Sequence, residues 1–209
     1  MKKEENKLPN ATIKRLPLYL SYLKSVKKSG QKSISSVEIG HALNFKSDLV
    51  RRDFSKIKAP GRKGAAYEVK KLVNHLHLIV NEKTEPEAAL IGAGRLGTAL
   101  LHYNHLRKSS PKIKMAFDNN PKVVGKTIAG VPVYHIDEMN ERLTASVTVA
   151  ILAIPAASAQ MVSEKLSETG ILGIMNFSSA YLKLPANVHL QQIDLARELD
   201  TLSFLIHFF

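Results

Sequence analysis

The sequence predicts an α/β protein in three parts: a helical N-terminal domain over residues 1–84, a mostly parallel sheet domain over residues 85–194, and a C-terminal helix over residues 195–209. Helical periodicity dominates the first part, and strand-like segments alternate with helix-like ones in the second. The polar, proline-ended segment 81–86 separates the two patterns. With 209 residues, 44% of them hydrophobic, the chain can build the cores of two small domains.

The N-terminal domain is expected to begin with three helices. The first should end near Ser29–Gly30, because lysines precede this pair and glycine favours helix ends. Ser35 and Glu38 have the spacing of a capping box for the second helix, and Ser47 is the expected N-cap of the third. The first helix is indicated by the spacing of Leu16, Leu20, Leu23 and Val26, and the second runs through Val37, Ile39 and Leu43. The candidates for the inner positions of the third helix are Leu49, Val50, Phe54 and Ile57.

A basic hairpin and a fourth helix complete this domain. Pro60–Gly64 has the composition of a tight turn, and Tyr67–Val69 that of a short return strand. A helix over Val69–Val80 follows. Three helices followed by a basic hairpin is the order of a winged-helix domain, in which the third helix enters the major groove of DNA.

The second domain is expected to alternate strands with helices. Helix-length stretches, notably Leu96–Arg107 and Ala156–Thr169, lie between apolar runs, which calls for a mostly parallel sheet with covering helices. The candidate strands are Ala88–Ile91, Ile113–Phe117, Val131–Tyr134, Val147–Ile154, Gly173–Phe177 and Val188–Ile193. The final helix, Leu195–Phe209, is unusually apolar for a chain end, so it either packs on its own domain or buries against a partner subunit.

The charge of the chain is divided unevenly. Residues 1–84 contain 19 lysines and arginines against 7 acidic residues, whereas residues 85–209 contain 11 of each. The whole net charge of +12 therefore lies in the first part, which indicates either a polyanion-binding domain or a solubilising basic face.

Composition also excludes several classes of protein. The absence of cysteine rules out disulfides and thiolate metal sites, so any redox sensing must use a bound ligand. The longest apolar run, Val147–Ala157, has about half of the ~20 residues that a membrane helix needs. The N-terminus has no apolar stretch after its lysines, so it is not a secretory signal, and we expect a cytoplasmic protein.

A glycine-rich loop carries the sharpest chemical signal, and its residues are Gly92, Ala93, Gly94, Arg95, Leu96 and Gly97. The three glycines permit a tight turn, close approach of a pyrophosphate, and close packing of the helix that follows. Asp118 ends the next strand 21 residues later, where a carboxylate accepts hydrogen bonds from ribose hydroxyls. The context of strand, loop and helix favours a Rossmann-like dinucleotide site over a structural turn.

The third helix and the hairpin supply the candidate DNA contacts: Ser47, Arg51, Arg52, Lys56, Lys58, Arg62 and Lys63. Arg51 and Arg52 point about 100° apart on a helix, so one can face a groove while the other holds a phosphate. The hairpin cations suit a minor groove or the DNA backbone. A solvated basic helix is the alternative, and the segregation of charge favours DNA binding over it.

The remaining polar residues give weaker indications of function than the glycine loop and the basic helix. His75 and His77 are too far apart around a helix to share a metal, and we expect neither a metal site nor catalytic residues. Tyr103 lies on the helix after the glycine loop, where it either approaches a nicotinamide or packs in the core. Asp194 either carries ligand or interdomain contacts or caps the last helix.

Together these residues resemble the Rex family of bacterial redox-sensing repressors over essentially the whole chain. The segments that carry the resemblance are Ala11–Tyr19, Val50–Ser55, Gly61–Gly64, Ile91–Ala99, Met115–Asp118, Gly130–Tyr134 and Ile193–Ala196. The resemblance implies a homodimer with exchanged C-terminal helices, which binds a double-stranded DNA operator when NADH is scarce and releases it when NADH rises. It also implies that Tyr103 lies near the nicotinamide and that Arg15 and Asp194 link the domains differently in the two states. The chain departs from the family at Lys56–Pro60, at Ala65–Ala66 and at Arg95.

Two other functions remain open. An NAD-dependent dehydrogenase with a basic accessory domain would need an acid or base beside the hydride acceptor, and little chain is left for a substrate site. A constitutive architectural DNA binder would be indifferent to NADH. We therefore expect a repressor rather than an enzyme, with NAD(H) as a sensed ligand and no membrane partner.

Overall fold

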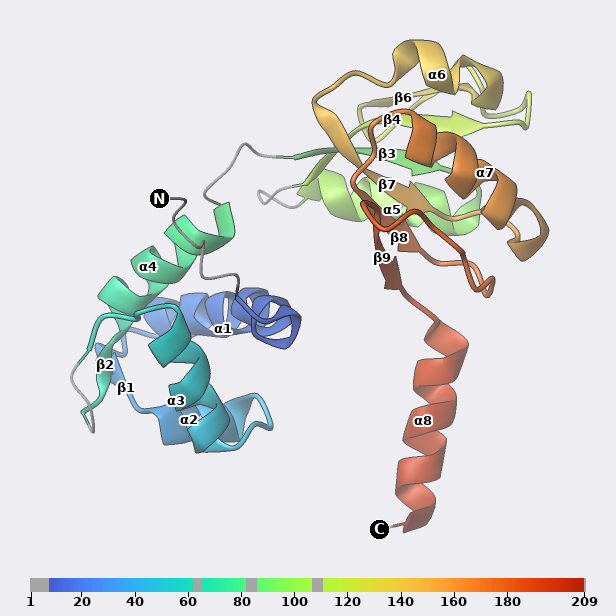
Figure 1. The fold of residues 1–209 in the computed structure, drawn as a ribbon. Coiled ribbons are helices and arrows are strands. Elements are labelled where there is room, and N and C mark those ends of the chain that lie inside the picture. Colours follow the sequence, from blue (N-terminus) through green and yellow to red (C-terminus); the bar gives the residue numbers. More distant parts are fainter. Residues whose placement is uncertain (1–7, 62–64, 82–85, 107–110, 209) are drawn as a thin grey trace, which may run out of the picture. The chain divides into compact units, whose positions relative to one another are not determined.

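The computed structural model describes residues 8–61, 65–81, 86–106 and 111–208 and divides the chain into two compact units, residues 1–84 and 85–209 (Figure 1). Each unit is described by itself. Among the described residues, every helix is too short or too polar to cross a membrane.

The first unit is helical with one small hairpin. Its elements are α1 (Asn10–Lys28), β1 (Ser33–Ile34), α2 (Ser36–Ala42), α3 (Ser47–Lys56), β2 (Tyr67–Glu68) and α4 (Val69–Asn81). The two strands pair antiparallel, with Ile34 opposite Tyr67. This is the predicted winged-helix order, and the return strand forms where it was expected.

The ends of these helices follow local chemistry. Helix α1 ends at a cap on Ser29, and Gly30 then adopts a φ of +85°, which glycine tolerates best. The capping box of α2 is present: the Ser35 hydroxyl accepts from the Glu38 N–H at 3.1 Å, and the Glu38 carboxylate accepts from the Ser35 N–H at 2.8 Å.

Ser47 is not the N-cap of α3, so that prediction is wrong. Lys46 occupies the cap position in an extended conformation, and its carbonyl accepts from the Leu49 N–H at 2.9 Å. No side chain caps this end, but Asp48 in the first turn places a negative charge at the positive end of the helix dipole. The helix therefore includes Ser47 as its first residue.

The core of the first unit joins α1, α3 and β2 through aromatic rings. Tyr19 and Phe54 are fully buried, with ring centroids 5.1 Å apart and planes at 74°, and Phe54 meets Tyr67 at 5.1 Å and 85°. Of the inner candidates of the third helix, Val50, Phe54 and Ile57 are buried. On α2, Ser36 and Ile39 are buried, whereas Val37 is 60% exposed.

The second unit is built on a seven-stranded sheet in the order β5-β6-β4-β3-β7-β8-β9. Neighbouring strands are parallel except β5, which pairs antiparallel with β6. The strands are β3 (Glu87–Ile91), β4 (Lys112–Asp118), β5 (Thr127–Ile128), β6 (Val131–His135), β7 (Val147–Leu152), β8 (Gly173–Asn176) and β9 (His189–Gln192). The short edge strand β5 was not predicted.

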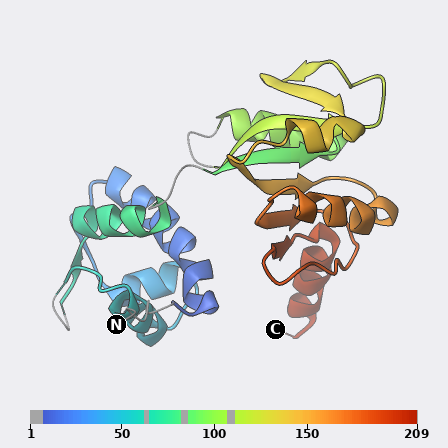
Figure 2. The same cartoon turned by 45° about the horizontal axis from the view of Figure 1, so that its top comes forward.

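Helices cover both faces of this sheet. They are α5 (Arg95–Leu106), the 3-10 helix η1 (Ile136–Glu138), α6 (Met139–Arg142) and α7 (Ala156–Glu168). Successive residues of β3 point to opposite faces. Leu90 packs with Leu101 of α5, whereas Ile91 belongs to the cluster that contains Val162 of α7. Figure 2 shows α5 and α7 on opposite sides of the sheet. The predicted Rossmann-like α/β fold is confirmed.

The chain ends in helix α8 (Leu195–Phe208), none of whose described residues is buried. Large apolar side chains are exposed along its length: Leu195, Leu199, Leu202, Phe204, Leu205, Ile206 and Phe208. In the single chain this helix therefore does not pack on its own domain, which was one of the two expectations for the segment.

Candidate nucleotide site and nucleic-acid interface

The glycine loop has the shape that a pyrophosphate requires. Gly92 adopts a φ of +93°, and a Cβ there would lie 2.5 Å from the Ala153 carbonyl oxygen. A Cβ on Gly97 would lie 1.9 Å from the Gly92 carbonyl oxygen, so α5 can pack against the loop only if residue 97 is glycine. At Gly94 the space is open, with nothing within 4 Å of a Cβ. These are the three roles expected of glycines in a dinucleotide loop, and the open space at Gly94 suits a phosphate.

Asp118 stands beside this loop at the end of β4. Its Oδ2 accepts from the Ala93 N–H at 2.6 Å, and its Oδ1 accepts from the Asn120 N–H at 2.8 Å. Two backbone donors therefore hold the carboxylate at the carboxyl edge of the sheet. Each oxygen retains acceptor capacity for a ribose hydroxyl.

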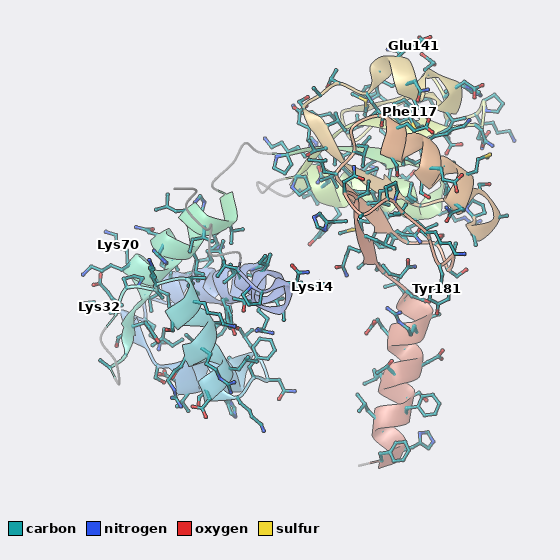
Figure 3. The ribbon with its side chains drawn as sticks, viewed as in Figure 1. Lys14, Lys32, Lys70, Phe117, Glu141 and Tyr181 are labelled. Atoms are coloured by element: carbon teal, nitrogen blue, oxygen red, sulfur yellow. The ribbon has the colours of Figure 1, made fainter. Side chains whose placement is uncertain are left out.

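A cavity of about 330 Å³ opens next to the loop and Asp118. Gly92, Gly94, Phe117 and Asp118 form one part of its lining, and Phe117 is labelled in Figure 3. The cavity lies at the carboxyl ends of β3, β4 and β7, where the strand order reverses. Open α/β sheets bind ligands at this switch point, and the volume is at the small end of the roughly 300–1,000 Å³ typical of such sites.

Sequence reasoning missed the far wall of this cavity. The wall is formed by residues after β4, β6 and β7 and by one face of α7: Asn119, Ile136, Asp137, Met139, Ala153, Ile154, Pro155, Ser158, Met161, Val162 and Lys165. Two signals point to it. Several residues directly follow predicted strands, and the four on α7 recur at intervals of three or four, so they share one face.

The structure places the remaining loop and helix residues outside the cavity lining. Arg95 and Leu96 are exposed in the first turn of α5, and Ala93 is buried with its N–H bonded to Asp118. Tyr103 lies two turns further on and is 59% exposed, so it is not a core residue of the single chain. Its proximity to a nicotinamide stays a prediction.

The exposed face of α3 is cationic, whereas its other face is buried in the core. Arg51, Arg52, Lys56 and Lys58 are exposed, and Ser47 is half-buried. The Arg51 guanidinium donates to the Ser36 hydroxyl at 3.2 Å and to Asp48, and Arg52 Nε approaches the Asp48 carbonyl oxygen at 3.4 Å. Both arginine side chains are thus held at the helix surface.

The segment that leads into the hairpin is only partly described. Lys58 follows α3 with a φ of +51°, an uncommon conformation for a residue with a side chain. Gly61 lies against the ring of Tyr67, because a Cβ on residue 61 would be 2.9 Å from that ring. Arg62 and Lys63, which were predicted to contact DNA, lie outside the described residues.

Arg15 and Asp194 lie in different units, and each has local partners. Arg15 forms an ion pair with Asp53 inside the first unit. Asp194 caps α8: its Oδ1 accepts from the Arg197 N–H at 3.1 Å, and its carbonyl accepts from the Glu198 N–H at 3.1 Å. Their role as an interdomain pair stays a prediction.

Asp53 is a second feature that sequence reasoning missed. Its carboxylate is fully buried and accepts hydrogen bonds from three side chains of α1: Thr12, Arg15 and Tyr19. Burial raises the pKa of Asp53, but the hydrogen bonds from Arg15, Tyr19 and Thr12 outweigh burial, so that the pKa lies below its usual value. The hydrogen bond to Asp53 raises the pKa of Arg15 in turn. Three polar residues at intervals of three and four on an otherwise apolar helix face were the available signal.

A basic winged-helix unit joined to a Rossmann unit with an open phosphate cradle defines a class: DNA-binding regulators that carry a dinucleotide-binding fold. Two family models match the chain, the putative DNA-binding protein N-terminus over residues 7–55 and the CoA binding domain over residues 83–180. The chain is 44% identical over 203 residues to the redox-sensing transcriptional repressor Rex of Bacillus cereus (strain AH820), with 97% of each chain covered, and equally similar to that of Bacillus anthracis.

Solved structures agree with these matches. The crystal structure of RSP, a Rex-family repressor, in complex with NAD⁺ and operator DNA has a TM-score of 0.86, 32% identity, and coverage of 96% of this chain and 93% of that one. The complex of RSP with NADH has a TM-score of 0.83, with 31% identity and coverage of 95% and 94%. The chain belongs to the Rex family of redox-sensing transcriptional repressors, and the resemblance read from the sequence is confirmed.

Proposed function

We propose that this protein is a transcriptional repressor that senses the ratio of NADH to NAD⁺ and leaves its DNA operator when NADH binds. One observation carries the proposal: an open phosphate cradle at Gly94 beside the fixed carboxylate of Asp118 lies on the same chain as the cationic face of α3. The relatives solved with NAD⁺, NADH and operator DNA support it.

The second unit would hold the nucleotide through its own backbone and side chains. The N–H groups at the start of α5 would face a pyrophosphate, because those of Gly92 and Ala93 already donate to the Phe117 carbonyl and to Asp118. Asp118 would accept from a ribose hydroxyl. The cofactor supplies a nicotinamide ring that is cationic when oxidised and neutral when reduced. The chain supplies no catalytic group in this proposal, because NAD(H) is sensed rather than consumed.

The first unit would bind the operator. Helix α3 enters a major groove, where Arg51 and Arg52 divide base and phosphate contacts, and Lys56 and Lys58 extend the basic surface along the backbone. The hairpin cations Arg62 and Lys63 would meet a minor groove. Residues 1–84 thus form the DNA-binding domain, residues 85–194 the NAD(H)-binding domain, and residues 195–209 the dimerisation helix.

Dimerisation follows from the exposure of α8. Seven large apolar side chains on a 14-residue helix would remain in water in a monomer. A second copy of the chain, with exchanged helices, buries them and brings two basic domains to an inverted repeat. As a regulator of DNA, the homodimer acts in the cytoplasm.

Switching requires that NADH bind the DNA-free form more tightly than the DNA-bound form, because a ligand shifts an equilibrium only by its differential affinity. Burying a cationic ring without a partner is costly, so an apolar site near Tyr103 favours the neutral reduced ring. Arg15 and Asp194 are the proposed pair that links the units differently in the two states.

Fluorescence anisotropy of a labelled operator, titrated with NADH and separately with NAD⁺ at fixed salt, tests the function. NADH should displace the DNA at concentrations where NAD⁺ does not. Equal displacement by both nucleotides, or by neither, would contradict the proposal. Turnover of NADH with common carbonyl substrates would instead support the dehydrogenase alternative.

A further inference from the structure

Helix α3 ends in a turn of the Schellman type, in which two backbone hydrogen bonds close the last turn around a left-handed residue. The Ala59 N–H donates to the Phe54 carbonyl at 2.8 Å, and the Lys58 N–H donates to the Ser55 carbonyl at 3.0 Å. Lys58 is the left-handed residue, with a φ of +51°. This conformation is unfavourable for a residue with a side chain, because its Cβ crowds the neighbouring backbone.

Three other helices place a more tolerant residue at the same position. Gly30 follows the cap of α1 with a φ of +85°, and Gly170 follows the cap of α7 with a φ of +88°. Asn44 follows the cap of α2 with a φ of +58°, and asparagine tolerates the left-handed region better than most residues. Lys58 therefore strains the end of α3, and such strain persists only where the surrounding structure enforces it.

A histidine of α4 supports this strained turn. His75 Nε2 lies 2.7 Å from the carbonyl oxygen of Ile57, the residue that caps α3. A carbonyl oxygen can only accept, so Nε2 carries the proton and donates. The donor is favourable there, because the carbonyls at the end of a helix form its negative pole. This carbonyl belongs to the peptide that joins Ile57 to Lys58, so the hydrogen bond fixes the backbone directly before the left-handed residue.

The turn displays a cation beside the basic face of α3. Lys58 is exposed, and it comes two residues after Lys56, which ends the helix. We propose that His75 is a positioning residue for DNA binding, because its hydrogen bond holds Lys58 in the conformation from which the ammonium meets a DNA phosphate. The inference rests on the proposed function and deepens it, since it assigns a part in DNA binding to α4, outside the recognition helix and the hairpin.

The salt dependence of DNA binding tests this inference. The full chain without nucleotide is titrated into a fluorescein-labelled DNA duplex of mixed sequence, which suffices because a phosphate contact does not depend on the bases. Lys58→Asn keeps a residue that tolerates the turn and removes the charge. The slope of log affinity against log salt concentration should therefore become shallower by about 0.9, the value for one phosphate contact.

His75→Ala should make the slope shallower in the same way, and it should cause no further loss of affinity when combined with Lys58→Asn. His75→Gln can donate to the Ile57 carbonyl through its amide, so its slope should lie closer to that of the wild type than to that of His75→Ala. Asn74→Ala is the matched control, because Asn74 is an exposed neighbour on α4, and this variant should bind as the wild type does.

A second measurement separates positioning from stability. Lys58→Gly relieves the strained conformation, so this variant should melt at a higher temperature than the wild type and yet bind DNA more weakly. A lower melting temperature of Lys58→Gly would overturn the inference. An unchanged slope in His75→Ala, or an equal loss of affinity with and without the Lys58 side chain, would also overturn it and leave the proposed function intact. Failure of the wild-type protein to bind duplex DNA would overturn both.

Discussion

Arg15 on α1 and Asp53 on α3 form a two-pronged ion pair: Arg15 Nε donates to Asp53 Oδ2 at 2.6 Å, and Arg15 Nη2 donates to Oδ1 at 2.8 Å. Tyr19 and Thr12 add hydrogen bonds at 2.8 Å and 2.9 Å, so that four donors surround a fully buried carboxylate. Asp53 lies directly after Arg51 and Arg52, so this network fixes the helix that carries both arginines to α1.

Arg15→Ala should destabilise the protein by about 3–5 kcal/mol, because it leaves a buried carboxylate without its cation. Urea unfolding of the full chain, followed by circular dichroism, measures this. Lys14→Ala is the control: Lys14 is exposed on the same helix (Figure 3), and its loss should change the free energy of unfolding by less than about 0.5 kcal/mol. Equal stability of the two variants would contradict a structural role for the pair.

The same carboxylate predicts the sign of a pH dependence. The pKa of Asp53 is lowered in the folded state, so its stabilisation is present above the unfolded value of about 4 and is lost as pH falls through the folded pKa. Asp53→Asn should therefore be less stable than the wild type at neutral pH, and the difference should shrink in acid below pH ~4. If the difference in stability between the two proteins grows on acidification, a group other than Asp53 dominates the pH dependence of stability.

Gly94 and Gly97 should respond differently to substitution, although they share one loop. Gly94→Val places its side chain in open space, so the protein should fold normally but lose NADH affinity by at least tenfold, because the side chain fills the place of the phosphate. In Gly97→Ala the added Cβ would lie 1.9 Å from the Gly92 carbonyl oxygen, so this variant should also have a lower melting temperature than the wild type. Normal NADH binding by a folded Gly94→Val variant would remove the loop from the site.

Asp118 should make the protein prefer NADH to NADPH, since its carboxylate accepts from a free 2′-hydroxyl and repels a 2′-phosphate. Asp118→Ala should weaken NADH binding and reduce the preference. Calorimetric titration of both nucleotides gives the two affinities. If the wild type binds both equally, and Asp118→Ala changes neither affinity, Asp118 has another role.

Arg51→Ala and Arg52→Ala should each weaken operator binding, by about 1–3 kcal/mol for an arginine that contacts a base. A phosphate contact would instead lower the salt dependence of binding with little loss of sequence preference. Arg142→Ala in the second unit, an exposed arginine paired with Glu138, is the control and should bind DNA as the wild type does. Unchanged affinity for the operator in both α3 variants would exclude this helix as the element that recognises the operator sequence.

Deletion of residues 196–209 should give monomers or insoluble protein, because it removes the exposed apolar side chains of α8. Light scattering coupled to size-exclusion chromatography distinguishes the states. A matched variant, Arg197→Ala, keeps the apolar residues and should remain dimeric. A soluble dimer of the truncated chain would place the interface elsewhere.

Features that depend on neighbours in the chain were predictable from the sequence. The capping box at Ser35 and the end of α1 before Gly30 depend on contacts within four residues. The glycine loop can be recognised from the spacing of its three glycines. The strands were predicted because apolar residues in a buried parallel sheet form continuous runs. Periodicity also predicted which face of α3 is buried, although the cap at Ser47 was one residue off, since helix ends depend on weak and easily exchanged contacts.

Contacts between distant segments were decided only by the tertiary structure. Arg15 meets Asp53 across 38 residues of chain, and Asp118 meets the Ala93 N–H across 25. Residue types alone did not reveal these pairs, because an arginine or aspartate is usually solvated and only its burial makes a partner obligatory. The far wall of the nucleotide cavity could not be predicted for the same reason, because nothing in the sequence distinguishes Asp137 and Lys165 from ordinary surface residues. The strands β6 and β7 run parallel in one sheet, so η1 and α7, which follow them, begin at the same edge.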